Sequence, residues 1–295
     1  MKITVLGSLG NINRHFLPRL IAENHDVTVV TSSVERISQI EEIGAKAAVG
    51  NMNNADFLTE TFKNSDVVYL MISAAGGAGN EQNLDTAMEK QAAIFAQAIQ
   101  NSGVKNVVNL SSIGADNPSA GALWAYHHIE NALSNLTNLN SLAIIRPVGF
   151  YNNLFQDLPS IKSDGTIYNV VKPEITRAYV DPADIAAVVF DKLTNISAGK
   201  SIKYVVSQFA TGNDWIAELE KNGISANYQV IPPASMQAGM EKMGLSTETA
   251  ELFVKMTVAQ EKPDFYKTLH ESDVHQGKIT LSDFAQKFAA VYKNN

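Results

Sequence analysis

The stretch Met1-Lys-Ile-Thr-Val-Leu-Gly7-Ser-Leu-Gly10-Asn-Ile-Asn13 joins a short apolar strand to a glycine turn and then to an amphipathic helix. Gly7 allows a tight turn, and Gly10 leaves room for a phosphate beside the free N–H groups of a helix N-terminus. Asn13 lies mostly off the apolar face of the helix and stands where a dinucleotide fingerprint usually has its third glycine. The stretch predicts a pyrophosphate site, and it also fits an ordinary strand-to-helix turn.

The composition narrows the class of protein. Of the 295 residues, 45% are hydrophobic and 18% are charged, which is enough apolar material for one large core or two lobes. The formal charge of −7 and the lack of a basic run argue against a nucleic-acid partner. The chain has no cysteine and no apolar run near the ~20 residues that span a bilayer. We therefore expect a cytoplasmic protein without nucleic-acid or membrane contact.

Apolar runs alternate with helical patterns through the first half of the chain. Between the fourth and fifth runs, Met88, Ala92, Phe95 and Ile99 recur at helical spacing and indicate a long helix that ends near Gly103. This alternation predicts an α/β protein with a doubly wound parallel sheet of the Rossmann type, whose ligand lies at the carboxyl ends of the strands. The six runs are residues 3–6, 27–31, 45–49, 67–72, 107–110 and 142–145.

The second half of the chain has a looser pattern, which suggests a second lobe. We expect residues 1–150 to form the nucleotide-binding domain, with residues 178–208 returning to it. Residues 151–177 and 209–280 are expected to form a smaller α+β lobe on the side of a substrate or partner. Residues 281–295 are expected to form a helix that docks on the body of the protein, starting at Thr280-Leu-Ser-Asp283.

The ends of the next strands suggest which dinucleotide is bound. No acid follows the second strand at its tip, and Ser32, Ser33 and Arg36 could hold the 2′-phosphate of NADP, while Glu35 would oppose it. We expect NADP, with NAD possible, and a solvated loop fits the same residues equally well.

The third and fourth strands end in residues suited to the rest of a dinucleotide. Asn51 and Met52 could meet an adenine edge after the third strand. Ser73 and Ala74 open a segment of small residues that a cofactor ribose could approach, or that could form a surface loop.

Several segments together resemble the NmrA-like branch of the atypical short-chain dehydrogenase/reductases. They are Gly7-Ser-Leu-Gly10-Asn-Ile, Gly103-Val-Lys-Asn-Val-Val-Asn-Leu-Ser111-Ser112, Ile144-Ile-Arg146-Pro147-Val-Gly-Phe150-Tyr-Asn-Asn153-Leu, Val180-Asp181-Pro-Ala-Asp184-Ile185-Ala and Leu281-Ser-Asp-Phe284-Ala-Gln-Lys-Phe288-Ala. They follow the family's order over essentially the whole chain. The resemblance implies an NAD(P)-binding Rossmann domain and a small C-terminal lobe over the nicotinamide end. Leu9, Asn11, Ile12, Ser111, Tyr126, Pro147 and Phe150 complete the expected cofactor contacts.

The expected active-site helix departs from the ordinary family pattern of Tyr-x-x-x-Lys, in which the lysine lowers the pKa of the tyrosine. If Glu130 matches the glutamate of the family, Tyr126 takes the lysine position and Ala122 takes the tyrosine position. In the other register Tyr126 is the tyrosine, and Glu130 replaces the lysine and would raise the pKa of the phenol. Neither register keeps the pair.

Substitute catalytic groups are few. Tyr126, His127 and Ser111 are the weak candidates, with His128 and Ser112 beside them; packing explains the histidines better, and cofactor contact explains the serines better. The six histidines show no metal-ligand spacing with carboxylates, so no metal site is expected.

Two functions therefore stay open. One is a reductase of a small carbonyl or quinone that relies on cofactor positioning. The other is a non-catalytic sensor of NADP that acts through a protein partner, as family members include both regulators and reductases.

Overall fold

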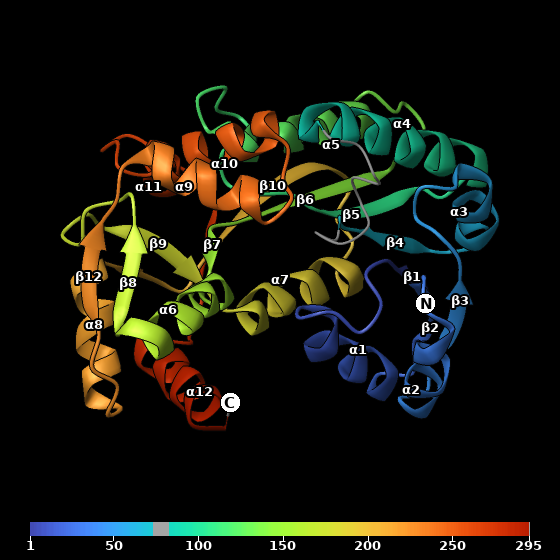
Figure 1. The fold of residues 1–295 in the computed structure, drawn as a ribbon. Coiled ribbons are helices and arrows are strands. Elements are labelled where there is room, and N and C mark those ends of the chain that lie inside the picture. The colour runs from blue at the N-terminus through green and yellow to red at the C-terminus, as the bar shows by residue number, and fades with distance from the viewer. Residues whose placement is uncertain (73–82, 295) are drawn as a thin grey trace.

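The computed structural model describes residues 1–72 and 83–294, and Figure 1 shows its two-lobed arrangement. Ser73 and Ala74 lie outside the described residues. The larger lobe is built on a parallel sheet of eight strands in the order β13-β10-β6-β5-β4-β1-β2-β3. Its strands are β1 (Lys2–Val5), β2 (Asp26–Thr31), β3 (Lys46–Val49), β4 (Val67–Leu70), β5 (Asn106–Leu110), β6 (Ser141–Pro147), β10 (Gly199–Val206) and β13 (Val274–Gln276).

Helices cover both faces of this sheet, so the predicted doubly wound Rossmann fold is confirmed. One face packs on α1 (Asn13–Ala22), α2 (Ile37–Glu42) and α7 (Pro182–Thr194), and the other on α3 (Ala55–Phe62), α4 (Leu84–Ser102) and α5 (His127–Ser134). The long helix predicted before Gly103 is α4, and Gly103 ends it at φ +77°. The strand order reverses between β1 and β4, and at such a point α/β sheets bind ligands.

The smaller lobe contains two short sheets. Strands β7 (Gly149–Phe150), β9 (Arg177–Val180) and β11 (Gln208–Ala210) form one, and β8 (Thr166–Asn169) and β12 (Asn227–Val230) form the other. The helical segments of this lobe are η3 (Tyr151–Asp157), α6 (Leu158–Asp164), α8 (Gly212–Lys221), α9 (Pro233–Lys242), α10 (Thr247–Ala259) and α11 (Thr268–Glu271). Within the described residues, no helix combines the length and apolar character needed to cross a membrane.

One segment differs from its expected place. The stretch that includes β13 was expected in the smaller lobe, but β13 extends the large sheet beside β10. The last helix, α12 (Leu281–Asn294), packs against the core of the smaller lobe. Its Phe284 stacks on Tyr151 with ring centroids 5.4 Å apart, and its Phe288 meets the edge of Trp215 at 5.1 Å. This aromatic cluster forms the core of the smaller lobe.

Candidate dinucleotide site

The glycine loop between β1 and α1 has the geometry of an anion site. Gly7 lies at φ +93°, and a Cβ on Gly10 would come within 2.9 Å of the Gly7 carbonyl oxygen. Among the described residues, the main-chain N–H groups of Leu9, Asn11 and Ile12 have no hydrogen-bond partner. No side chain caps α1 at Ile12 either. The loop therefore offers unpaired donors at a helix N-terminus, where an anion is favoured.

Asn13 braces this loop from inside. Its side-chain Nδ2 donates to the carbonyl oxygens of Leu6 and Ser8, both at 2.8 Å, and the residue is only 2% exposed. Its expected place off the buried helix face was therefore wrong, because hydrogen bonds to the loop turn this amide inward. Asn13 thus links strand, loop and helix at the position of the third fingerprint glycine.

A cavity of about 280 Å³ joins the glycine loop to the end of β2. Arg36 is exposed there, and its guanidinium makes a long bond of 3.5 Å to Gln39. Glu35, the opposing carboxylate, is exposed and is not part of the lining. The structure thus brings together most of the residues expected around the phosphates; the lining is Gly7, Ser8, Leu9, Gly10, Thr31, Ser32, Ser33 and Arg36.

The turn after β3 adjoins the same cavity. The Gly50 N–H donates to the carbonyl of Thr31 at 2.9 Å, which fixes the turn to a residue of the cavity wall. The side-chain Oδ1 of Asn51 accepts from the Asn53 N–H at 2.9 Å. The carbonyl of Met52 accepts from Nε2 of Gln91 on α4 at 3.0 Å. Asn51 and Met52 therefore lie near the dinucleotide cavity, in a turn with its own hydrogen bonds.

Ser111, at the carboxyl end of β5, is part of a buried charge network. Its hydroxyl donates to Oε1 of Glu130 at 2.5 Å, and Ser111 is 3% exposed. The guanidinium of Arg146 on β6 binds both carboxylate oxygens of Glu130, at 2.9 and 2.7 Å. It also binds Asp116 and the Tyr204 hydroxyl. Burial would lower the pKa of Arg146, but its contacts with Glu130 and Tyr204 raise it above the usual value.

Sequence reasoning missed the partners in this network. Arg146 in a run of buried apolar residues was an available signal, because a buried arginine requires a partner. The partners Glu130, Asp116 and Tyr204 lie 16, 30 and 58 positions away, so only the tertiary fold identifies them.

The other catalytic candidates lie on η2 (Gly121–Tyr126) and α5. Tyr126 is partly buried against the core beneath α4 and α5, and this burial raises its pKa. Nδ1 of His127 lies 2.6 Å from the Trp124 carbonyl oxygen, and its ring stacks on Trp124 at 4.0 Å. His128 pairs with Asp85 of α4 at 2.9 Å. Both histidines are thus held by neighbours on the helices rather than by the strand ends.

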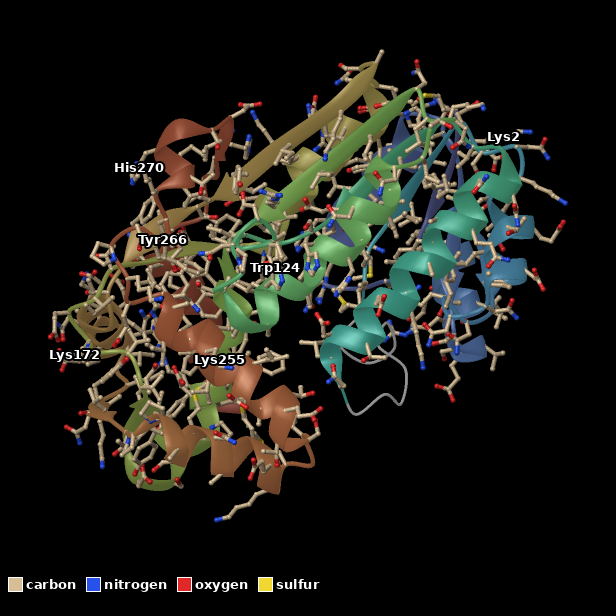
Figure 2. All side chains as sticks on the ribbon, turned by 90° about the horizontal axis from the view of Figure 1, so that it is seen from above. Lys2, Trp124, Lys172, Lys255, Tyr266 and His270 are labelled. Carbon is tan, nitrogen blue, oxygen red and sulfur yellow. The ribbon has the colours of Figure 1, made fainter. Side chains whose placement is uncertain are left out.

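Helix α10 closes over η2. Gly121 lies at φ +58°, and a Cβ there would collide with the Leu252 carbonyl and the Met256 N–H of α10. Viewed from above in Figure 2, η2 with Trp124 and α10 with Lys255 lie next to each other. The main chain of the smaller lobe therefore touches the segment that leads into α5.

Apolar side chains gather where the strands of the large lobe end. Leu9, Met71, Leu123 and Phe150 are all partly buried against the first core cluster. They come from the glycine loop, the end of β4, η2 and β7. Pro147 is the last residue of β6 and directly follows Arg146.

A protein family described as NAD(P)H-binding matches residues 7–195. A photosystem II assembly factor of Synechocystis sp. is 22% identical over 241 residues, which cover 80% of this chain and 72% of that protein. An Escherichia coli NADPH-dependent quinone oxidoreductase complexed with NADPH has a TM-score of 0.77 at 16% identity, over 97% of this chain and 99% of that chain. Citrobacter sp. triphenylmethane reductase complexed with NADP(H) has a TM-score of 0.75 at 17% identity, over 98% and 100%.

At such identities the solved structures show that the fold is shared, but they do not show that the reaction is shared. The matched family, by contrast, covers more than half of the chain and begins at Gly7 of the phosphate-site loop. This protein therefore belongs to the NAD(P)H-binding family.

Proposed function

We propose that this protein is an NADPH-dependent reductase whose acceptor, such as a quinone, needs no proton from a protein side chain. One contrast carries the proposal. The phosphate loop and its cavity are open for a dinucleotide, whereas the candidate acids are held in internal contacts or, in Tyr126, weakened by burial, which raises the pKa. The similarity to a quinone oxidoreductase and a dye reductase fits this chemistry.

The residues present fit NADPH. The free N–H groups of Leu9, Asn11 and Ile12 would bind the pyrophosphate. Ser32, Ser33 and Arg36 would bind the 2′-phosphate, since arginine pairs well with phosphate oxygens and no acid lines the cavity. Asn51 and Met52 would meet the adenine.

Glu130 favours the register in which Tyr126 takes the lysine position. Its carboxylate is buried against Arg146 and Ser111, so it anchors α5 to the sheet and does not face Tyr126 as a lysine substitute. Ala122 then stands where the tyrosine would be. The Tyr126 hydroxyl has no partner within the described part of the chain, and its raised pKa keeps it protonated. It would bind the nicotinamide ribose as a neutral group.

The remaining candidates are engaged in internal contacts. The Ser111 hydroxyl already donates its hydrogen bond to Glu130, so its oxygen can only accept a hydrogen bond from a ligand. His127 is held at the Trp124 carbonyl. NADPH, when bound, supplies a hydride, and one proton from water completes the reduction of a quinone to the hydroquinone. Leu9, Met71, Leu123 and Phe150 would offer an apolar surface to such a planar acceptor.

A second candidate function rests on α10. Its main chain is packed against Gly121, so a rearrangement of η2 on cofactor binding would reach the smaller lobe directly. This contact favours a sensor that reports NADP occupancy to a protein partner.

Titration calorimetry with NADPH and NADH, followed by a turnover screen with quinones and triphenylmethane dyes, tests both functions. We expect tighter binding of NADPH and NADPH-dependent loss of at least one acceptor. Binding of NADPH without turnover of any acceptor would favour the sensor. Failure to bind either dinucleotide would overturn both proposals.

A further inference from the structure

We infer that a second cavity, apart from the dinucleotide site, binds a small zwitterion with one ammonium and one carboxylate group. The volume of this cavity is about 420 Å³, compared with about 280 Å³ for the cavity at the glycine loop. Among the described residues, the linings of the two cavities have no member in common. The inference therefore goes beyond the proposed reductase function and does not depend on it.

This cavity lies where the chain crosses between the two lobes. Ser207 joins β10 of the large sheet to β11 of the smaller lobe, and Gly277 and Lys278 lie between β13 and α12. The Ser207 hydroxyl donates to Asp184 of α7 at 2.6 Å, and a Cβ on Gly277 would collide with the same carboxylate. The other wall is α8, which packs on α12 at the end of the smaller lobe away from α10 (Figure 1). A ligand in this cavity would therefore hold α8 against the segments that connect the lobes.

The wall formed by α8 has an excess of negative charge. Asp214 and Glu218 lie one helical turn apart and both line the cavity, together with Lys221 of the same helix. Lys221 binds Oε1 of Glu218 at 2.6 Å and lowers the pKa of this carboxyl, whereas the charge of Asp214 raises it. Oδ2 of Asp214 accepts from the N–H and the hydroxyl of Thr211, while its Oδ1 has no partner in the described chain. The two carboxylates repel each other, so a further cation beside them is favoured.

The wall formed by the segment between β13 and α12 has a positive charge to offer. Within residues 1–72 and 83–294, the ammonium group of Lys278 has no ion pair and no hydrogen bond, and Lys278 lines the cavity. Its main chain is fixed, because its N–H donates to Asp184 at 3.0 Å. The carboxylate of Asp184 also accepts from the Ser207 hydroxyl and the Ile279 N–H. An anionic group of a ligand is therefore favoured beside the Lys278 ammonium group.

A ligand that serves both walls carries both charges. The described lining contains two carboxylates and two lysines, so its formal charge is zero and a ligand without net charge leaves it balanced. A lone cation would leave Lys278 without a partner, and a lone anion would leave the repulsion between Asp214 and Glu218 in place. The volume is near the lower end of the range for ligand pockets, roughly 300–1,000 Å³, so the ligand should be small. We therefore expect a molecule of the amino-acid class.

The test uses straight-chain amino acids of increasing length, from glycine to 6-aminohexanoate, in thermal-shift and calorimetric titrations of the wild type. The alkylamine and the carboxylate of matched length, at equal ionic strength, carry only one of the two charges. We expect one length of the series to bind with a Kd of about 1 mM or below and to raise the melting temperature. Its singly charged counterparts should bind at least about tenfold more weakly, because each leaves one wall without a partner. A series in which no amino acid binds more tightly than its amine and its carboxylate would overturn the inference.

Two variants locate the ligand in this cavity. Lys278→Gln removes the charge of one wall and keeps the main-chain bond to Asp184, and Glu218→Gln removes a charge from the other wall. Lys242→Gln and Glu220→Gln are the matched controls at exposed positions outside the lining, the second on the same helix as Glu218. Each cavity variant should weaken the amino acid by about tenfold or more, and each control should keep the affinity of the wild type. Unchanged affinity in the cavity variants would refute the inference, and if Glu218→Gln does not fold, Lys278→Gln alone decides.

Discussion

At the position of the third fingerprint glycine, Asn13 uses its amide to connect Leu6 and Ser8 across the phosphate loop. Asn13→Ala removes two buried hydrogen bonds, so the free energy of unfolding should fall by about 1–3 kcal/mol. NADPH binding should weaken as well, because the loop loses its brace. Urea unfolding and calorimetry measure the two effects. Asn13→Gln is the control, because it keeps the amide group but lengthens the side chain. An Asn13→Ala protein of unchanged stability would contradict a bracing role for Asn13.

Arg36 should decide between the two dinucleotides. Arg36→Glu places a carboxylate beside the proposed 2′-phosphate, so NADPH should bind at least about tenfold more weakly while NADH changes little. Calorimetric titration with NADPH and with NADH measures the two changes in affinity. Lys105→Glu makes the same charge change just before the amino end of β5, away from the cavity, and should leave the affinity for both ligands unchanged. Equal losses of NADPH and NADH in Arg36→Glu would mean that Arg36 supports the loop rather than reading the phosphate.

Tyr126 should matter for cofactor affinity and little for proton transfer. Tyr126→Phe should leave quinone reduction within about tenfold of the wild type, whereas loss of an acid–base tyrosine costs roughly 10²–10⁴-fold. The reason is that burial raises the pKa of the Tyr126 phenol, which makes it a weaker proton donor. Steady-state kinetics at saturating NADPH measure this. A hundredfold drop in kcat with unchanged cofactor affinity would restore an ordinary tyrosine-dependent mechanism.

Individual residues also show which parts of the site could be predicted from the sequence. Gly7, Gly10, Ser32, Ser33 and Arg36 were predicted to gather because strand ends of a parallel sheet meet at one edge, and they line one cavity. The bonds from Ser111 to Glu130 and from Gln91 to Met52 depend on how helices dock on that sheet. No spacing in the sequence encodes such docking.

At the scale of elements, all six predicted strands of the first half are present, with ends shifted by up to two residues. Continuous apolar runs between helical patterns are the strongest signal for buried parallel strands. Strand β13 was missed because it has three residues, two of which are His275 and Gln276. Its place is set by Asp184, whose carboxylate accepts from the N–H groups of Lys278 and Ile279 just beyond it.

The junction between η3 and α6 contains a carboxyl group that should make stability depend on pH. Burial raises the pKa of Asp157 to about 6, although Trp215 and Arg177 oppose the shift. The folded state therefore holds this proton more tightly than the unfolded chain, and stability should fall as pH rises from about 4 to about 6. Above that range the ionised, buried carboxylate costs up to about 3 kcal/mol.

Asp157→Asn should remove this cost. Its melting temperature should exceed that of the wild type at pH 7.5, and the difference should vanish below about pH 4, where the wild-type carboxyl is protonated in both states. Thermal melts across this range measure the effect. The exposed Asp264→Asn, in the same lobe, serves as control and should follow the wild type. A variant that is less stable than the wild type at pH 7.5 would show that the carboxylate is better compensated than its burial suggests.

At the scale of the whole molecule, each lobe has its own core, and a segment after α10 also packs into the core of the large lobe. Phe265, Tyr266 and Leu269 follow α10 in the chain, yet they belong to the cluster that packs under the large sheet. Lys287 of α12 pairs with Asp181 at the start of α7, at 3.1 Å. The smaller lobe is therefore bound to the nucleotide-binding lobe by packing and charge, and a ligand on one lobe can change the stability of the other.

This coupling predicts that NADP saturation changes the protease sensitivity of residues 235–270. If the cofactor orders η2 beside Tyr126, α10 should be held more firmly at Gly121, and cleavage in this segment should slow several-fold. Limited proteolysis with and without NADP, read by mass spectrometry, measures it. Gly121→Val displaces α10 and should abolish the protection, while a thermal shift with NADP shows that binding persists. Protection that is the same with and without NADP, in a protein that binds it, would leave the sensor without a mechanism and favour the reductase.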